Sequence, residues 1–290
     1  MSDSSLAGAE RLDEFVDLHM HSTASDGALP PAKVIAAARA ARLGAVSLTD
    51  HDTTAGLAEA RAAGAQHGIR VINGVELSAV EDDTETHILG LHLSELNELE
   101  HRLSGLREMR MGRAMRMVER LESLGVSITF EAVLAQAAGG AVGRPHVARA
   151  LIAAGHAGDF REAFERWLGN GKPAFVAKDR LPLAEAIGLI RRAGGLAILA
   201  HPGSQGTRER IAALAALGLD GVEVLHPGHS WDDAQRLDSL AGEFDLVRSG
   251  GSDWHGSSDG SRSLGMMRVP STWLAAQDAR VAARGSRRVA

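Results

Sequence analysis

The stretch Asp17-Leu18-His19-Met20-His21 places two histidines two positions apart at the end of the apolar run Phe15–His19. Side chains at positions i and i+2 of a β-strand point to the same face. If this run is a strand, His19 and His21 can reach one ion together. A single His-x-His pair also fits two polar residues at a strand end, so its meaning depends on the rest of the chain.

Comparable residues close or follow other apolar runs. They are Asp26, His51, Glu76, His87, His201, Asp253 and His255. The runs predict strands at Phe15–His19, Ala45–Thr49, Arg70–Leu77, Thr86–His92, Leu196–Ala200, Gly221–Leu225 and Leu246–Ser249. Catalytic side chains gather at the C-terminal ends of the strands in α/β barrels. We therefore expect these groups to converge at one end of a sheet.

Helix-like segments alternate with these strands, which predicts an α/β fold with a mostly parallel sheet and an incomplete seven-stranded, TIM-like barrel. The alternation stops between about Ser94 and Arg180, which predicts a helical insertion between strands four and five. The expected division is a discontinuous barrel at 14–93 and 181–275, an insertion or substrate subdomain at 94–180, and tails at 1–13 and 276–290.

The composition of the chain limits the kinds of site and partner that it can have. The chain has no Cys, so a metal has to be held by His, Asp or Glu, and thiol nucleophiles are excluded. The net charge of −6 argues against a broad surface for long duplex nucleic acid. Met1–Glu14 is polar, and no apolar stretch approaches the roughly 20 residues that span a bilayer. We expect a cytoplasmic protein without membrane contact.

Six imidazoles and three carboxylates are enough to hold up to three divalent ions. Such ions would leave a local positive charge that attracts a phosphate dianion, although the whole chain is acidic. Mixed oxygen and imidazole ligands favour Mn²⁺, Fe or Zn²⁺ over Ca²⁺, and Mn²⁺ is the expected ion.

Six motifs together resemble the PHP (polymerase and histidinol phosphatase) superfamily. They are Asp-Leu-His-Met-His-Ser from residue 17 with Ser-Asp-Gly from 25, Leu-Thr-Asp-His-Asp from 48, Gly-Val-Glu-Leu from 74, His-Ile-Leu-Gly from 87, Ala-His-Pro from 200 and Gly-Ser-Asp-Trp-His from 251. The resemblance implies a distorted seven-stranded β/α barrel. It also implies three metal positions, held by His19, His21, Glu76 and Asp253, by Glu76, His87 and His201, and by Asp26, His51 and His255.

The Ser-Asp-Gly form and the segments Gly143–His146 and Gly171–Val176 resemble one branch of that superfamily. Its members are bacterial phosphatases of nucleoside 3′,5′-bisphosphates and 5′→3′ oligoribonucleases of the RNase AM type. The branch implies a small phosphorylated nucleotide or a short 5′-phosphorylated RNA as substrate. We expect attack by a metal-bridging hydroxide held by Glu76, Asp253, His19 and His21. The sequence does not identify any protein partner, so protein partners stay unknown at this point.

Three further residues are candidate substrate contacts. Arg144 and Lys172 suit a second phosphate, and His229 lies near a probable helix start. Each also fits a structural role, as a helix-terminal ion pair, a solvated loop residue and a neighbour of a helix cap. Asp50 and His226 stand beside the proposed ligands and are expected to support them.

A basic stripe on one predicted helix is a further candidate for a binding surface. A row of arginines recurs every three or four residues on one predicted helix, and it fits a solvated, ion-paired face better than an RNA-binding one. Its members are Arg107, Arg110, Arg113, Arg116 and Arg120.

The alternatives to a nucleotide phosphatase are a phosphatase of histidinol phosphate or a sugar phosphate, and a non-catalytic metal-bound module that serves a polymerase or RNA.

Overall fold

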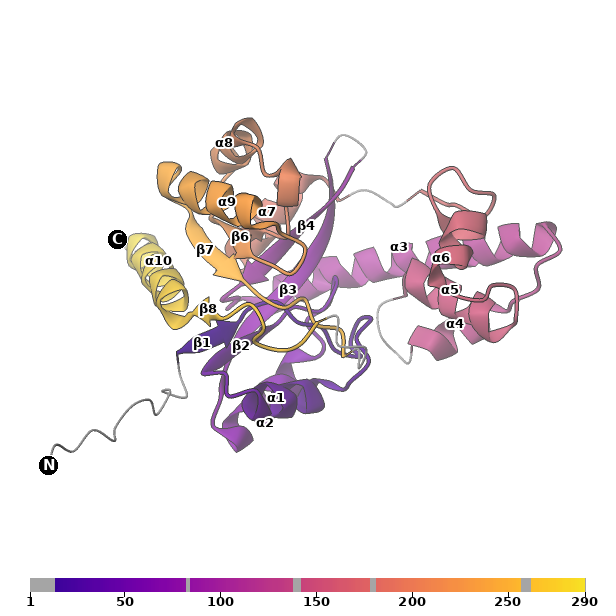
Figure 1. Ribbon diagram of the computed structural model, residues 1–290, viewed down its shortest axis with the longest axis horizontal. Coiled ribbons are helices and arrows are strands. Elements are labelled where there is room, and N and C mark those ends of the chain that lie inside the picture. The colour runs from indigo at the N-terminus through magenta and orange to yellow at the C-terminus, as the bar shows by residue number, and fades with distance from the viewer. Residues whose placement is uncertain (1–13, 82–83, 138–141, 178–180, 257–261, 290) are drawn as a thin grey trace, which may run out of the picture.

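The computed structural model describes residues 14–81, 84–137, 142–177, 181–256 and 262–289 (Figure 1). One sheet has the strand order β7-β6-β5-β4-β3-β2-β1-β8. The strands are β1 (Phe15–Asp17), β2 (Ala45–Leu48), β3 (Arg70–Glu81), β4 (Thr84–Leu91), β5 (Leu196–Leu199), β6 (Gly221–Leu225), β7 (Val247–Gly250) and β8 (Val269–Pro270). The predicted α/β, barrel-like fold is confirmed, with a two-residue eighth strand added.

Strand β4 departs from the expected direction. It runs antiparallel to both β3 and β5, whereas β1–β2–β3 and β5–β6–β7 are parallel. Only residues 82–83 separate β3 from β4, with Glu81 paired to Thr84. A connection this short joins only antiparallel strands, because a parallel pair needs a crossover of about a dozen residues.

The two ends of the sheet approach each other beside β1. The amide of Leu18 donates to the Gly250 carbonyl at 3.1 Å, and the amide of Asp253 donates to the His19 carbonyl at 2.8 Å. Gly251 makes this approach possible, because a Cβ at its position would lie 2.5 Å from both the backbone N and the Cβ of His19. The sheet is therefore a nearly closed barrel.

Helices cover the outside of this sheet (Figure 1). They are α1 (Pro31–Ala40), α2 (Leu57–His67), α7 (Leu183–Arg192), α8 (Arg208–Ala216), α9 (Trp231–Glu243) and α10 (Ser271–Val289), with a short 3-10 turn η2 at Gly203–Gln205. Helix α7 shows why they pack there: Leu183, Ala186, Ile187 and Ile190 recur every three or four residues and are buried against the sheet. Among the described residues, no helix is both long and apolar enough to cross a membrane.

The predicted C-terminal tail is ordered instead. Helix α10 continues to Val289, so most of 276–290 is helical. Gln277 is fully buried, and its side-chain amide donates to the Arg248 carbonyl at 2.7 Å. Arg284 forms an ion pair with Asp220. The sequence of this region is rich in arginine, which obscured the apolar face that docks on the barrel.

A helical segment lies between β4 and β5. It comprises α3 (Leu96–Ser123), α4 (Phe130–Ala137), α5 (Arg144–Ala153), α6 (Phe160–Ala163) and the π-helix η1 (Phe164–Leu168). Leu99 and Leu103, near the start of α3, belong to the core of the barrel. Met117 and Leu121, near its end, belong to a separate core with the helices that follow. One helix thus joins two cores, and α4–α6 stand away from the sheet in Figure 1.

Candidate metal centre

The nine predicted ligands come from six strands or the loops that follow them, and they lie together. Three overlapping groups have ligand atoms within 4.8 Å of one another. The groups are His19, His21, Glu76 and Asp253, then His51, Glu76 and His87, and lastly His21, Asp26, His51 and His255. His201 lies beside the second group. The structure therefore brings together side chains that are up to 236 positions apart in the sequence.

Glu76 is at the centre of these groups and is buried. Its Oε2 lies 3.3 Å from His19 Nε2, 3.2 Å from His21 Nε2 and 3.2 Å from His51 Nδ1. Burial alone would raise the pKa of this carboxyl, but the surrounding imidazoles outweigh burial and hold its pKa well below the usual value. Glu76 is therefore a carboxylate with both oxygens available to cations.

The other Glu76 oxygen faces two more histidines. Oε1 lies 2.9 Å from His87 Nδ1 and 3.0 Å from His201 Nε2. The resemblance assigned His87 and His201 to one position with Glu76, whereas the geometric group adds His51 in place of His201. The two sets share Glu76 and His87, so the third ligand of this position remains a prediction.

Asp253 completes the group around His19 and His21. Its Oδ1 lies 3.3 Å from His19 Nε2 and 3.1 Å from His21 Nε2. The backbone φ of Asp253 is 49°, and that of His201 is 31°, both in the left-handed region that non-glycine residues seldom adopt. Such strain persists where the surrounding structure imposes it, as at functional sites.

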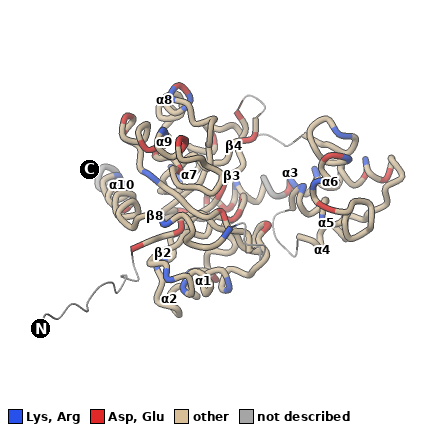
Figure 2. Tube along the Cα trace, viewed as in Figure 1, with Lys and Arg blue, Asp and Glu red and all other residues tan. Residues whose placement is uncertain are grey.

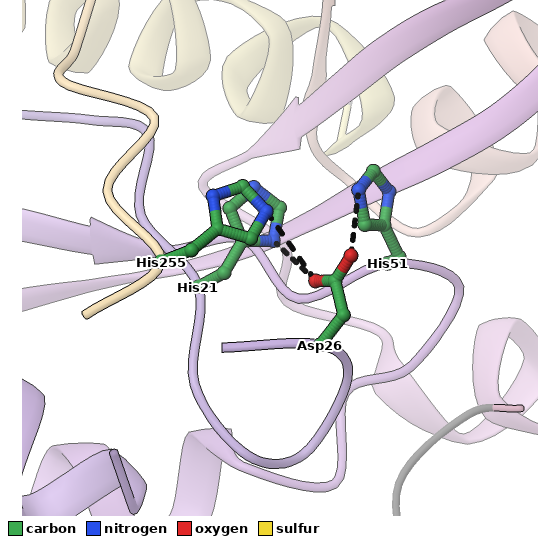
Figure 3. Close-up of side chains that lie close together, drawn as sticks. All are labelled: His21, Asp26, His51 and His255. Atoms are coloured by element: carbon green, nitrogen blue, oxygen red, sulfur yellow. Dashed lines mark ion pairs between the residues drawn. The ribbon is translucent and has the colours of Figure 1, made fainter. Parts of the chain in front are cut away.

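The third group is drawn in Figure 3, where His21, His51 and His255 surround the carboxylate of Asp26. Its Oδ1 lies 3.4 Å from His255 Nε2 and 3.9 Å from His21 Nδ1, and its Oδ2 lies 3.9 Å from His51 Nε2. The rings of His21 and His255 stack with centroids 4.2 Å apart. These separations leave room for an ion between the imidazoles and the carboxylate.

The donor set fits divalent metal ions. Both ring nitrogens of His21 and Nδ1 of His51 are buried and have no hydrogen-bond partner among the described residues. Buried polar atoms without partners are costly and call for an explanation. Without a metal, burial lowers the pKa of His21 and His87, but nearby carboxylates raise them to about 10 and about 9. Divalent cations would replace those protons and satisfy the orphaned nitrogens.

Asp50 and His226 support the predicted ligands. Asp50 accepts hydrogen bonds from the Ser22 amide at 2.7 Å and from the Ser25 hydroxyl at 2.7 Å, which fixes the loop that carries Asp26. The Nδ1 of His226 accepts from the Gly228 amide at 3.0 Å, so its Nε2 carries the proton and donates to Asp253 Oδ2 at 3.4 Å.

Three supporting residues were missed from the sequence. Glu223 lies in β6 with its Oε1 3.1 Å from His19 Nδ1, and its Oε2 accepts from the His201 amide at 2.7 Å. Asp17 accepts from the Ser252 amide at 2.9 Å and so holds the loop before Asp253. Arg262 forms an ion pair with Asp253. A signal existed for Glu223, because it is an acidic residue inside the apolar run Gly221–Leu225.

A cavity of about 210 Å³, here called the basic cavity, opens beside the third group. Asp26, His51 and His87 of the barrel line it together with Arg110, Arg144 and His146 from α3 and α5. Arg144 lies over the rings of Phe164 and Phe175, 5.7 and 6.0 Å from their centroids. The guanidinium is therefore held in place by aromatic faces next to the predicted ligands.

His146 was named only as part of the Gly143–His146 segment. Its Nδ1 accepts from the Gly143 amide at 3.0 Å, and this bond caps α5. Burial lowers the pKa of His146 to about 4, so the ring is neutral at pH 7. The proton is then on Nε2, which gives the basic cavity a fixed hydrogen-bond donor.

The other two predicted substrate contacts lie differently. Lys172 is exposed in a turn and does not line the basic cavity. His229 donates from Nδ1 to the Val224 carbonyl at 2.9 Å and accepts at Nε2 from the Gly203 amide at 3.1 Å. Both of its ring nitrogens are thus used by the backbone, and the structure does not offer His229 to a substrate.

Part of the arginine stripe on α3 faces inward rather than solvent. Arg110 pairs with the buried Asp52 and donates to the Ser78 hydroxyl at 2.8 Å. Arg113 is buried and donates to the Val176 carbonyl at 2.8 Å. Figure 2 shows basic positions on α3. The expectation of a solvated face is wrong for these two residues, because helical spacing does not reveal which face docks.

Comparisons with known proteins agree with this site. The PHP domain model matches residues 17–170. The chain is 40% identical over 259 residues to a 3′,5′-nucleoside bisphosphate phosphatase of Chromobacterium violaceum, covering 86% of this chain and 90% of that protein. It is 38% identical over 245 residues to a 5′-3′ exoribonuclease of Haemophilus influenzae, covering 82% and 89%.

A solved structure is similar as well. A protein of Bifidobacterium adolescentis assigned as a metal-dependent phosphoesterase superposes with a TM-score of 0.82 at 33% identity, covering 91% of this chain and 96% of that one. The family model spans more than half of the sequence, and the relatives align over most of their length. The chain therefore belongs to the PHP domain family and is a metal-dependent hydrolase of phosphate esters.

Proposed function

We propose that the chain removes the 3′-phosphate from nucleoside 3′,5′-bisphosphates and, at the same site, degrades short 5′-phosphorylated RNA from its 5′ end. The observation that carries this proposal is that Arg144 lines the basic cavity together with Asp26, His51 and His87. One phosphate would lie at the metal cluster, and a second, on the same nucleotide, would lie at Arg144. The names of the relatives support this substrate class.

We infer that up to three divalent ions, with Mn²⁺ as the expected one, are held by the nine predicted ligands. When bound, such ions lower the pKa of a water ligand, polarise P–O bonds and neutralise charge on phosphate. Glu76, with imidazoles on both of its oxygens, would bridge two positions. Glu223 and His226 would orient His19 and Asp253 through their outer atoms.

The remaining residues position the substrate. Arg144 can form two parallel hydrogen bonds to a 5′-phosphate, which Lys cannot. His146 would donate from Nε2 to the same phosphate or to the ribose. Arg110 is already paired with Asp52 and would add positive charge to the wall of the cavity. We propose that 94–180 is the substrate-binding unit, since α3 and α5 supply these groups, and that the protein acts in the cytoplasm.

One assay series tests the function. Purified protein with Mn²⁺ is given adenosine 3′,5′-bisphosphate, AMP, histidinol phosphate and a 5′-phosphorylated trinucleotide, and its metal content is measured by elemental analysis. The proposal predicts phosphate release from the bisphosphate and AMP-type products from the RNA, with AMP itself resistant. Faster hydrolysis of histidinol phosphate would favour the alternative phosphatase. No hydrolysis of any ester by metal-loaded protein would favour the non-catalytic module.

A further inference from the structure

A second cavity, here called the outer cavity, adjoins the metal cluster at His87 and His201. It measures about 380 Å³, compared with about 210 Å³ for the basic cavity. Glu85 and His87 line both cavities. Two cavities thus adjoin the candidate metal centre, and of these two only the basic cavity is lined by Arg144.

A phosphate monoester does not need the second space. In a nucleoside 3′,5′-bisphosphate, the nucleoside and its 5′-phosphate lie on one side of the reacting phosphorus, and the other oxygens of that phosphate are unsubstituted. In RNA, one of those oxygens is O5′ of the next nucleotide. An enzyme that accepts both must have room for a chain beyond the reacting phosphate, in a space separate from the one that holds the 5′-phosphate.

The same bond breaks in both reactions. Water adds its hydroxyl to phosphorus while the P–O3′ bond breaks, and O3′ takes the proton and leaves as the 3′-hydroxyl of a nucleoside 5′-phosphate. From the bisphosphate the other product is inorganic phosphate. From RNA it is the remaining chain, whose O5′ keeps the phosphate. Each cleavage therefore regenerates a 5′-phosphorylated end that can enter the basic cavity again.

We propose that the outer cavity is the subsite for the downstream chain of a phosphodiester substrate. This inference rests on the proposed function and names the part of the protein that extends it from a mononucleotide to RNA. The wall offers hydrogen-bonding groups: Arg210 of α8 offsets the charge of Glu81, to which it donates at 2.8 Å, and donates to the Thr86 hydroxyl at 2.7 Å. Hydroxyl, amide and ion-paired groups of this kind can form hydrogen bonds to a ribose-phosphate backbone.

Gln205 of η2 is a suitable position for a test substitution, because it lines the outer cavity and is not one of the predicted ligands. Its side chain is exposed and lines the outer cavity, and its backbone amide donates to the Pro202 carbonyl at 2.9 Å. Ser204 precedes it, is also exposed and does not line the cavity. The two positions form a matched pair. A bulky residue at either position perturbs the same turn, but only a residue at position 205 fills the outer cavity.

The test compares Gln205→Trp with Ser204→Trp on two substrates. For each variant we measure kcat/KM for a 5′-phosphorylated trinucleotide and for adenosine 3′,5′-bisphosphate. Blocking the subsite with Gln205→Trp should lower the RNA-to-bisphosphate ratio by roughly tenfold or more. Ser204→Trp should leave the ratio as in the wild type. Equal loss on both substrates, or no change with Gln205→Trp, would overturn the proposal.

A substitution that adds positive charge at the same position should change the RNA-to-bisphosphate ratio in the opposite direction. Gln205→Lys should raise the RNA-to-bisphosphate ratio by attraction of downstream phosphates, and the gain should shrink as salt screens it. An unchanged ratio would count against the subsite. If the wild type hydrolyses neither substrate, the proposed function fails. If it hydrolyses the bisphosphate but not the trinucleotide, the RNA part of the proposed function and the outer-cavity proposal fail together. If it hydrolyses both and Gln205→Trp leaves the ratio unchanged, the outer-cavity proposal alone fails.

Discussion

The Nδ1 of His19 lies 3.1 Å from Oε1 of Glu223, and both side chains are fully buried. Burial alone would lower the pKa of His19, but Glu223, Glu76 and Asp253 raise it well above its usual value. Glu223 therefore fixes the proton on Nδ1 and turns Nε2 toward Glu76 and Asp253. A histidine held in this way is the usual arrangement of a metal ligand.

Removal of this partner should weaken metal binding. Glu223→Ala leaves the His19 ring free to turn and removes a charge, so we expect metal affinity to fall about 10- to 100-fold. The measurement is metal content after dialysis against graded concentrations of free Mn²⁺. Glu209→Ala, on the exposed side of α8, is the control. Equal metal affinity in both variants would rule out this role for Glu223.

Loss of a predicted ligand should abolish both metal loading and turnover. His19→Ala and Asp253→Ala each remove one of four groups around a single position. We expect no detectable phosphate release, together with a lower metal-to-protein ratio, and chelation of the wild type should have the same effect until metal is restored. Circular dichroism checks folding. Full activity with fewer bound ions would contradict the assignment.

Arg144 and Lys172 should respond differently to substitution. Hydrogen bonds to charged groups contribute about 1.5–3 kcal/mol, so Arg144→Gln should lower kcat/KM for the bisphosphate by roughly 10- to 100-fold. Lys172→Gln should change it by less than about twofold, since exposed charges are screened. Steady-state kinetics on adenosine 3′,5′-bisphosphate decides between them. A larger effect at Lys172 would show that the 5′-phosphate binds elsewhere.

The neutral His146 should make stability depend on pH. Its pKa is lowered to about 4 in the folded chain, chiefly by burial, and is near 6.5 when unfolded. Between these values the unfolded state binds the proton and the folded state does not, so this residue lowers the free energy of unfolding as the pH falls from 6.5 toward 4.

The variant His146→Asn isolates that contribution. Asn can still accept from the Gly143 amide but cannot be protonated. As the pH falls through this range, the free energy of unfolding of the wild type should decrease more than that of the variant. Urea denaturation with chelator present is the measurement, because metal release would otherwise add its own pH dependence. Parallel pH profiles would mean that His146 binds its proton over the same pH range in the folded and unfolded states.

The sequence predicted the fold class well because each ligand follows or lies within an apolar run. Local spacing places His19 and His21 on one face, and the parallel order of the strands other than β4 brings the remaining ligands except His87 to the same end. Strand β4 shows the limit of this reasoning. The residue types in β4, such as Thr86 and His87, do not indicate the direction of the strand. Only the two-residue connection at 82–83 shows that β4 runs antiparallel to β3.

The supporting residues were harder to predict because their partners are distant in sequence. Glu223 is 204 positions from His19, and no local pattern links the two. Arg110 and Asp52 come from the insertion and the barrel, and their ion pair depends on how α3 docks. His229 has the residue type of a substrate contact, but the backbone around Val224 and Gly203 engages both of its nitrogens.

Helix α3 has a consequence for how this protein can diverge. It carries Leu103 in one core and Leu121 in the other without interruption, so its length sets the rotational phase between the barrel and the Arg144 region. One residue added midway would turn the far end by about 100° and advance it by about 1.5 Å. Seven added residues would nearly restore the phase. A related chain that keeps every ligand could therefore acquire a different substrate through a change in the length of α3.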